Sequence, residues 1–217
     1  MAKVGSKRGS YSSPRQQERQ ERVLQSAREL IANRGYDGLT MRELARVSEV
    51  SDKTLYNLFA TKDGLVMAAV ADLLDAIVTQ VQAGEQAAGL AAILRYTDAI
   101  SAQILVSPEY AQAMSRALFQ AEDSSPIVDL LLRSNQKFLQ RQLRHAQRRG
   151  ELTRRVQSAR TAALLTAHTW GVLLLWNKGL LSLSSLPTMS RQSMLTSLSG
   201  VVSEQGQIVL KNWSDNV

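Results

Sequence analysis

The stretch from Leu39 to Lys62 constrains the fold more than any other, because its pattern predicts two short helices joined by a tight turn. Thr40 is followed three residues later by Glu43, which is a Thr-x-x-Glu pattern that caps the start of a helix. Ser51 is suited to cap the next helix. Apolar residues recur at spacings of three and four and give each helix one face to bury: Met41, Leu44, Ala45, Leu55, Leu58 and Phe59. The stretch therefore predicts a helix-turn-helix.

The second of these helices has a polar face opposite its apolar one, formed by Asp52, Lys53, Thr54, Tyr56 and Asn57. Side chains of these types contact phosphates and base edges when a helix lies in the major groove of DNA. One helix-turn-helix contacts too few base pairs for useful specificity. Two copies related by a two-fold axis contact a palindrome whose half-sites lie about 34–36 Å apart. The pattern favours a DNA-binding homodimer.

The composition and the net charge of the chain are those of a soluble protein that binds a polyanion. The chain has 217 residues, a net charge of +7 and no cysteine, so disulfides, thiol nucleophiles and Cys-based metal sites are excluded. Charge alone does not distinguish nucleic acid from an anionic membrane surface. No apolar core follows the N-terminal basic residues, and the most apolar run, Leu164 to Trp176, is too short to span a bilayer. We expect a cytoplasmic protein without a membrane partner.

The whole chain is predicted to be all-α, with about nine helices and no strand pattern. Leu, Ala, Gln, Ser and Arg are frequent and aromatic residues are few, which favours helices over sheets. We expect a disordered basic arm at 1–12, a three-helix DNA-binding domain at 13–60, and a ligand-binding and dimerisation domain at 61–217. The arm is either a solvated tail or a segment that follows DNA. After the opening stretch, caps, prolines and glycines predict helices at about 61–82, 91–105, 107–120, 126–149, 158–181 and 188–211.

The last two predicted helices, the eighth (158–181) and the ninth (188–211), are apolar on more than one side. A helix of this kind is buried on more than one side. Gly200 and Gly206 permit close approach of another backbone. We expect the two helices to form a four-helix bundle with those of a second copy, the alternative being that they only close the core of the monomer.

Residues 22–65 resemble the tetracycline-repressor (TetR) family of bacterial transcription regulators. The resemblance implies an all-helical homodimer in which the N-terminal domain binds an operator. It further implies that the C-terminal domain carries a ligand pocket and the dimer interface. The residues that carry it are Ala27-Arg28-Glu29-Leu30-Ile31, Gly35-Tyr36, Leu39-Thr40-Met41-Arg42-Glu43-Leu44-Ala45, Val50-Ser51, Thr54-Leu55-Tyr56, Phe59 and Lys62.

The sequence departs from the family pattern at the turn and at the start of the second helix. Where the family commonly has Ala-Gly-Val, this chain has Ser48, Glu49 and Val50. Glu49 must take a conformation that glycine takes more easily, at a cost of about 1 kcal/mol. Lys53 stands where glycine is frequent, and Asp52 stands where a basic residue is common. The base preferences of relatives therefore do not transfer to this chain.

Eight residues are expected to contact DNA. Lys53, Thr54 and Asn57 suit base edges, whereas Tyr56 suits a phosphate through its hydroxyl group. In the alternatives, the capping residues serve only as caps, the arginine pairs with a neighbouring charge, and the tyrosine packs on the first helix. The full set is Thr40, Arg42, Ser51, Lys53, Thr54, Tyr56, Asn57 and Lys62.

The C-terminal part offers a weaker pattern. Seven residues could line a mostly apolar ligand cavity, although each one by itself is better suited to an ordinary core. They are Tyr96, Tyr110, Met114, Phe119, Phe138, His168 and Trp170. A basic run is expected to be a solvated face, and the alternative is contact with an anionic ligand or DNA. It comprises Arg133, Lys137, Arg141, Arg144, Arg148, Arg149, Arg154 and Arg155.

These patterns predict a ligand-responsive regulator, a repressor that binds a palindromic operator as a dimer and is released by a small molecule. The alternatives are a helical-bundle enzyme or a small-molecule carrier without DNA binding, and a bundle that binds a membrane surface or a partner through the basic run. Gly-x-Ser-x-Gly, phosphate-loop, His-Glu-x-x-His and Glu-x-x-His motifs are missing, and the two histidines, His145 and His168, lie on different predicted helices. We expect no catalytic residue, metal site or cofactor.

Overall fold

The computed structural model describes residues 14–83 and 88–214, and helices make up most of it, which confirms the predicted all-α class. The predicted basic arm at 1–12 lies outside the described residues. Short π-helical residues Asp129–Arg133 join α7 to α8. The helices are α1 (Pro14–Gly38), α2 (Met41–Val47), α3 (Asp52–Leu58), α4 (Lys62–Gln82), α5 (Leu90–Val106), α6 (Pro108–Gln120), α7 (Pro126–Val128), α8 (Ser134–Arg148), α9 (Ser158–Asn177), α10 (Leu186–Ser199) and α11 (Glu204–Ser214).

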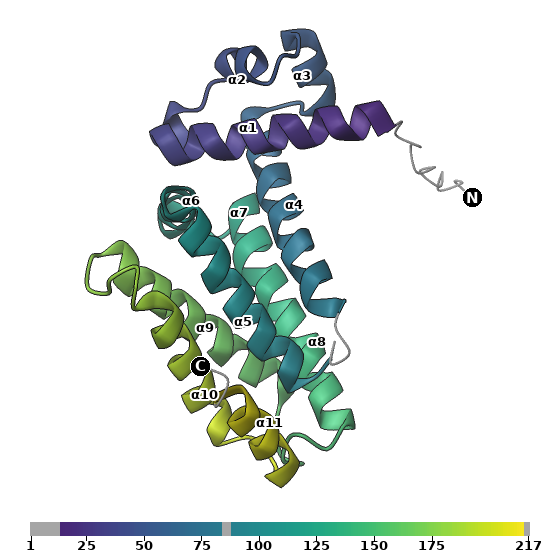
Figure 1. The fold of residues 1–217 in the computed structure, drawn as a ribbon, viewed down its shortest axis with the longest axis vertical. Helices are drawn as coiled ribbons and strands as arrows, with labels where there is room; N and C mark the ends of the chain where they lie inside the picture. The colour runs from purple at the N-terminus through teal and green to yellow at the C-terminus, as the bar shows by residue number, and fades with distance from the viewer. Residues whose placement is uncertain (1–13, 84–87, 215–217) are drawn as a thin grey trace.

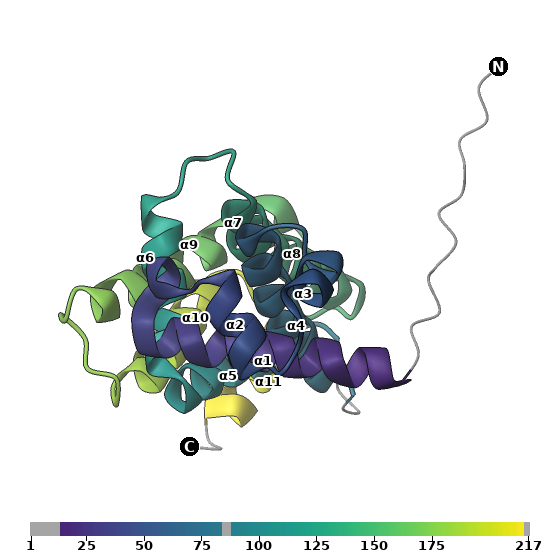
Figure 2. The same ribbon diagram turned by 90° about the horizontal axis from the view of Figure 1, so that it is seen from above.

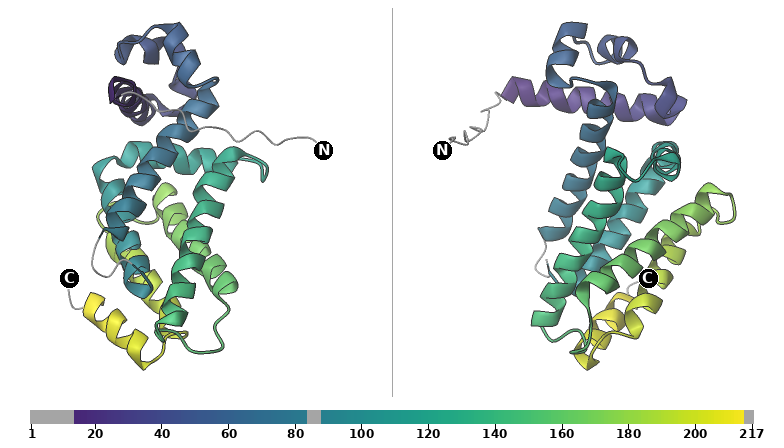
Figure 3. Two further views of the ribbon diagram at one scale, coloured as in Figure 1. Left: turned by 90° about the vertical axis from the view of Figure 1, so that its right-hand side faces the viewer. Right: turned by 180° about the vertical axis from the view of Figure 1, so that it is seen from behind.

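The first three helices lie at one end of the molecule, with α1 lying across the top of the helical body (Figure 1). Helices α2 and α3 lie on the outer side of α1, away from that body (Figure 1), and in the view from above they overlap the body (Figure 2). Helix α4 leads from this end into the body, where α9 and α10 lie side by side along one flank (Figure 3). One apolar core is shared by α1, α2, α3, α4 and α6, and a second lies between α5, α8, α9 and α10.

Helix α4 joins the two parts of the fold. Among the described residues it is the one helix that is long and apolar enough to cross a membrane. Its apolar residues Leu65, Val66, Ala69 and Val70 are buried in the first core, however, and Ile77 is buried in the second. The apolar character of α4 therefore serves packing within the protein.

Three of the predicted helix starts are confirmed by hydrogen bonds of their capping side chains. The hydroxyl oxygens of Thr40, Ser51 and Thr61 accept the backbone N–H groups three residues later, at N···O distances of 3.3, 3.1 and 3.0 Å. Gly35 has φ of 73°, a conformation that favours glycine, and it interrupts α1. These bonds span three residues, which is why the sequence by itself predicts them.

The predicted last helix at 188–211 is wrong as a single element, because the chain leaves helical geometry between α10 and α11. The N–H of Thr153 donates to the carbonyl of Val201 (3.0 Å), and the N–H of Ser203 donates to that of Glu151 (3.1 Å). Gly206 lies so close to Glu151 that a Cβ atom there would collide with its carbonyl oxygen. This close approach was expected at Gly206, whereas a Cβ atom at Gly200 would meet nothing within 4 Å.

Candidate nucleic-acid interface

The turn between α2 and α3 is fixed by backbone hydrogen bonds. The N–H of Val50 donates to the carbonyl of Ala45 (3.0 Å), and the N–H of Glu49 donates to that of Arg46 (3.4 Å), which is the bonding pattern of a Schellman motif. Glu49 has φ of 56°, so it takes the left-handed conformation expected from the sequence. The buried side chains of Leu44 and Leu55 hold the two helices against α1.

Replacing Glu49 with glycine should raise the free energy of unfolding by about 0.5–1 kcal/mol, because glycine adopts this conformation without the clash of a Cβ atom. Chemical denaturation of the parent and the variant measures the change. Glu49→Ala is the matched control, since it removes the carboxylate and keeps the Cβ atom. An equal gain in Glu49→Ala would show that charge, and not backbone conformation, is responsible.

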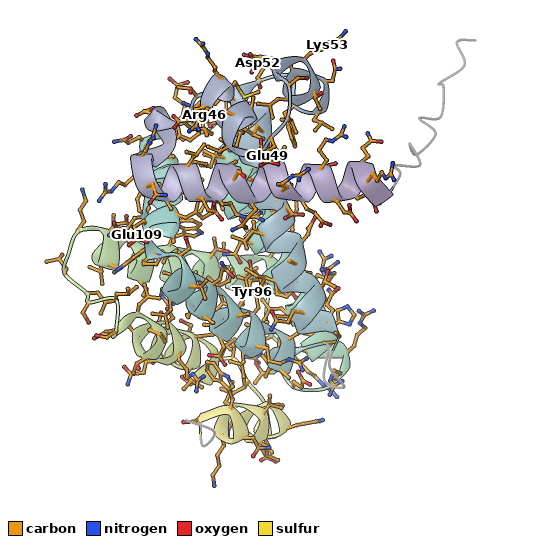
Figure 4. The ribbon with its side chains drawn as sticks, turned by 45° about the horizontal axis from the view of Figure 1, so that its top comes forward. Arg46, Glu49, Asp52, Lys53, Tyr96 and Glu109 are labelled. Carbon is orange, nitrogen blue, oxygen red and sulfur yellow. The ribbon has the colours of Figure 1, made fainter. Side chains whose placement is uncertain are left out.

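Helix α3 carries four of the eight residues that the sequence assigns to DNA. Lys53 and Asn57 are exposed, and the Tyr56 side chain is 53% exposed. Thr54 is half-buried, and its hydroxyl group lies 2.9 Å from that of Ser51. Figure 4 shows Lys53 at the outer end of the molecule, remote from the helical body. A face exposed in this way can enter a groove of DNA.

A shallow depression of about 550 Å³ brings three of the predicted contacts together: Thr40, Arg42 and Ser51. Its fourth polar side chain of interest is Arg46, whose side chain is 74% exposed and lies 3.8 Å from the Glu43 carboxylate. Sequence reasoning missed Arg46, although it lies four residues after Arg42 and hence on the same side of α2. The acids Glu43 and Asp52 also line the depression, and its two guanidinium groups and its hydroxyl groups are the parts suited to phosphate.

Lys62 is more constrained than the other predicted contacts. Its ammonium group donates to the carbonyl of Asp37 (N···O 3.4 Å) and lies 4.9 Å from the centre of the Tyr36 ring. The Tyr36 hydroxyl group donates to Asp63, and partial burial together with this bond raises the pKa of Tyr36 to about 12. These contacts fasten the start of α4 to the end of α1. The phosphate contact of Lys62 stays a prediction.

Four of the seven residues predicted for a ligand cavity line one cavity of about 120 Å³: Tyr96, Tyr110, Met114 and Trp170. Asn135 on α8, which sequence reasoning missed, lines the same cavity. Its side chain is buried, and an asparagine in a strongly amphipathic stretch carries little signal of burial. The cavity lies between α4, α5, α6, the α7–α8 region and α9, in the helical body where Figure 4 places Tyr96.

The other three predicted residues do not line this cavity. Phe138 stacks on Tyr96 with ring centres 4.4 Å apart and belongs to the second core. Phe119 is 42% exposed and meets the edge of Trp170 at 6.1 Å between ring centres. His168 is exposed on α9 and hydrogen-bonds to Ser197 on α10. The sequence correctly predicts that all three residues lie on helices of the body, but it does not determine which way their side chains point.

A larger hollow of about 650 Å³ lies between α1, the start of α4 and α6. It is lined by charged side chains, including Arg34, Asp63, Glu109 and Arg116. Figure 4 shows Glu109 at the edge of the body. The hollow marks the junction of the first three helices with α6, whereas the smaller cavity has the mostly apolar lining of a small-molecule site.

The basic run forms an exposed face on α8 and the segment after it. Lys137, Arg141 and Arg144 are exposed, while Arg133 pairs with Asp129 and Arg149 pairs with Glu151. Across residues 14–83 and 88–214, no three His, Asp or Glu side chains gather closely enough to hold a metal ion. The basic run is therefore partly exposed and partly paired, and its role as a solvated face stays a prediction.

Comparisons with known proteins agree on one family. Residues 23–69, which include α2, the turn and α3, match the family model described as "Bacterial regulatory proteins, tetR family". The chain is 26% identical over 157 residues to the HTH-type transcriptional regulator UidR of Escherichia coli strain K12. That alignment covers 70% of this chain and 78% of the relative.

Solved structures extend the likeness to the whole fold. A TetR-family transcriptional regulator from Rhodococcus sp. superposes with a TM-score of 0.69 at 22% identity, covering 86% of this chain and all of that one. The tetR regulator TylP from Streptomyces fradiae gives a TM-score of 0.68 at 21% identity, covering 89% of this chain and 86% of that one. Together with the helix-turn-helix geometry, these matches show that residues 23–69 form the domain found in the tetR family of bacterial regulatory proteins and that the whole chain has the fold of such regulators.

Proposed function

We propose that this protein is a ligand-responsive, sequence-specific DNA-binding regulator that represses transcription in the cytoplasm and carries out no enzymatic step. The proposal rests on the exposed face of α3. This helix is capped by Ser51, and its opposite face is buried in the core of the helix-turn-helix. Relatives described as transcriptional regulators support it. In this proposal residues 13–60 bind DNA, and residues 61–217 bind the ligand and the second subunit.

The proposed dimer forms through α9 and α10. Exposed residues recur on α9 at spacings of three and four, and most of them are apolar or small, which is unusual for a solvated face. His168 links this face to α10, whose Met189 is 39% exposed. The α9 residues of the face are Ala163, Leu164, Ala167, His168, Gly171, Leu174 and Leu175. A two-fold axis through this face would pair α9 and α10 with their copies in a four-helix bundle.

Helix α6 supplies the route from ligand to DNA. Tyr110 and Met114 on α6 line the 120 Å³ cavity, and both are also buried in the core shared with α1 and α4. A ligand that displaces α6 therefore displaces α1, on which α2 and α3 are packed. A change of a few ångström in the separation of the two α3 helices misaligns one half-site, so the ligand and the operator favour different arrangements.

The proposal is tested by a gel shift on the intergenic DNA beside the protein's own gene, with a random DNA library as a second source of operator. The parent should bind one palindromic site. Arg42→Ala and Tyr56→Ala should each weaken binding about tenfold, because each removes a phosphate contact from both subunits. Arg42→Ala should also lower the slope of log K against log salt by about two, one for each copy.

Arg144→Ala is the matched control, since Arg144 is an exposed arginine on α8, remote from the helix-turn-helix. It should leave the affinity and the salt slope unchanged. If Arg144→Ala weakens binding as much as Arg42→Ala does, the basic face of α8 contacts DNA and the site is misassigned. If the parent binds no DNA from either source, the proposed function is wrong.

A further inference from the structure

Three buried polar atoms belong to residues that line the 120 Å³ cavity and have no hydrogen-bond partner among residues 14–83 and 88–214. They are the hydroxyl oxygen of Tyr110, Oδ1 of Asn135 and Nε1 of Trp170. The Tyr110 and Asn135 side chains are more than nine-tenths buried. Leaving a buried polar group unpaired costs about 1–3 kcal/mol, so buried polar groups in proteins are nearly always bonded. Because all three atoms belong to residues that line one cavity, a molecule that enters it from solvent is a candidate for the missing partner.

The chemistry of these atoms defines the partner. The indole N–H of Trp170 only donates, the phenol of Tyr110 donates or accepts, and the Asn135 carboxamide supplies an acceptor. A single hydroxyl or carbonyl oxygen on the partner can satisfy the indole and the phenol, and a hydroxyl group can also donate to the carboxamide. The rest of the described lining is mostly aliphatic, with Leu73, Ile77 and other apolar side chains from α4, α5 and α9.

The lining of this cavity disfavours a charged ligand. Its described lining contains no Asp, Glu, Lys or Arg. Burial raises the pKa of Tyr96 to about 12 and raises that of Tyr110 further, although Arg28 opposes the shift at Tyr110. Both phenols are therefore neutral at physiological pH. An ion in this cavity would lose its hydration without gaining an opposite charge, which is strongly unfavourable.

We propose, on the basis of the proposed function, that the effector is an uncharged, mostly apolar molecule about as large as a benzene ring with one small substituent that carries a hydroxyl or carbonyl oxygen. The polar oxygen is bound by Tyr110, Asn135 and Trp170. The size follows from the volume, because an apolar cavity of about 150 Å³ accepts benzene. A neighbouring cavity of about 20 Å³, which shares Tyr96 and Asn135, leaves room for a small substituent.

Four probes with one shared ring test this assignment on the full chain at neutral pH: benzyl alcohol, toluene, benzoate and benzylammonium. Binding is measured by calorimetric titration and by the shift of the melting temperature. Benzyl alcohol and toluene should bind and raise the melting temperature, since both are uncharged. Benzoate and benzylammonium should do neither. Binding of either ion as tightly as benzyl alcohol overturns the proposal, and so does binding of none of the four.

Two variants test which atoms bind the oxygen. Tyr110→Phe removes only the hydroxyl group and should raise the Kd of benzyl alcohol about threefold to tenfold, with the Kd of toluene unchanged. Asn135→Leu should raise the Kd of benzyl alcohol by a similar factor. Its Kd for toluene should be no higher than that of the parent. If the ratio of the two Kd values is the same in both variants as in the parent, the cavity holds water or a ligand without these contacts, and the proposal is wrong.

Operator binding, measured separately in the same preparations, distinguishes this failure from a failure of the proposed function. If the parent binds its operator but the probes behave contrary to expectation, only the assignment of the effector is wrong. If the probes bind as expected but no DNA is bound by the parent, the cavity is a small-molecule site and the regulatory function is wrong. Release of operator by benzyl alcohol, but not by benzoate, would support both.

Discussion

Replacing Leu164 with aspartate should convert the dimer into a monomer and weaken operator binding by at least about a hundredfold. Leu164 is 54% exposed on the outer face of α9, where the proposed two-fold axis brings α9 against its copy. An unpaired carboxylate at that position would be buried once in each subunit, close to the same charge on the partner. A monomer contacts one half-site and loses the gain in affinity that linkage of two half-sites provides, which is about 10²–10⁴.

Sedimentation equilibrium measures the oligomeric state, and fluorescence anisotropy with labelled operator measures the affinity. The matched control is Ile208→Asp, since Ile208 is 61% exposed but lies on α11. Helix α11 is fastened to α5, where the indole N–H of Trp213 donates to Asp98 (2.7 Å). The control should remain a dimer. If Ile208→Asp dissociates and Leu164→Asp does not, the interface lies on α11 and the proposed α9 face is wrong.

Replacing Glu151 with alanine should lower the free energy of unfolding by about 2–3 kcal/mol, which is large for a residue in a loop. The Glu151 side chain is 2% exposed, and its carboxylate accepts the N–H of Leu90 (2.8 Å) at the start of α5. It also accepts Nε of Arg149 (2.6 Å). Gly89, the residue before α5, has no side chain to cap that helix, so Glu151 supplies the cap from 61 residues away.

Urea denaturation at fixed protein concentration measures the change, because the stability of a dimer depends on concentration. Glu151→Gln keeps the shape and one acceptor oxygen, so it should cost less than Glu151→Ala. Glu122→Ala, at an exposed position, should change the stability by no more than about 0.5 kcal/mol. A cost of Glu151→Ala equal to that of Glu122→Ala would show that the buried carboxylate contributes nothing to stability.

Glu151 also illustrates what helical periodicity fails to predict. The sequence shows it as the one acid in a long basic run, which is a hint of a special role but not of a partner. Its carboxylate caps α5, and its carbonyl accepts the N–H of Ser203 in the break between α10 and α11. Each partner lies more than fifty residues away, and so no local pattern indicates that the predicted ninth helix must be interrupted there.

The lining of the candidate ligand cavity is likewise not predictable from local sequence patterns. Aromatic residues on the right helices were predictable from composition and spacing, but spacing does not determine which of them share one cavity. Packing turns Tyr110 and Trp170 toward the same space and stacks Phe138 on Tyr96 in the core. It also adds Asn135, whose polar side chain would be expected on the surface if α8 were considered alone.

By itself, the sequence determined the helix-turn-helix, its caps at Thr40 and Ser51, and the left-handed turn at Glu49, because these features depend on hydrogen bonds and sterics within a few residues. Only the tertiary structure decided the lining of the cavity, the exposed face of α9 and the cap supplied by Glu151. Those features depend on which side chains meet across helices distant in sequence, and burial and packing select among faces that the sequence leaves equivalent.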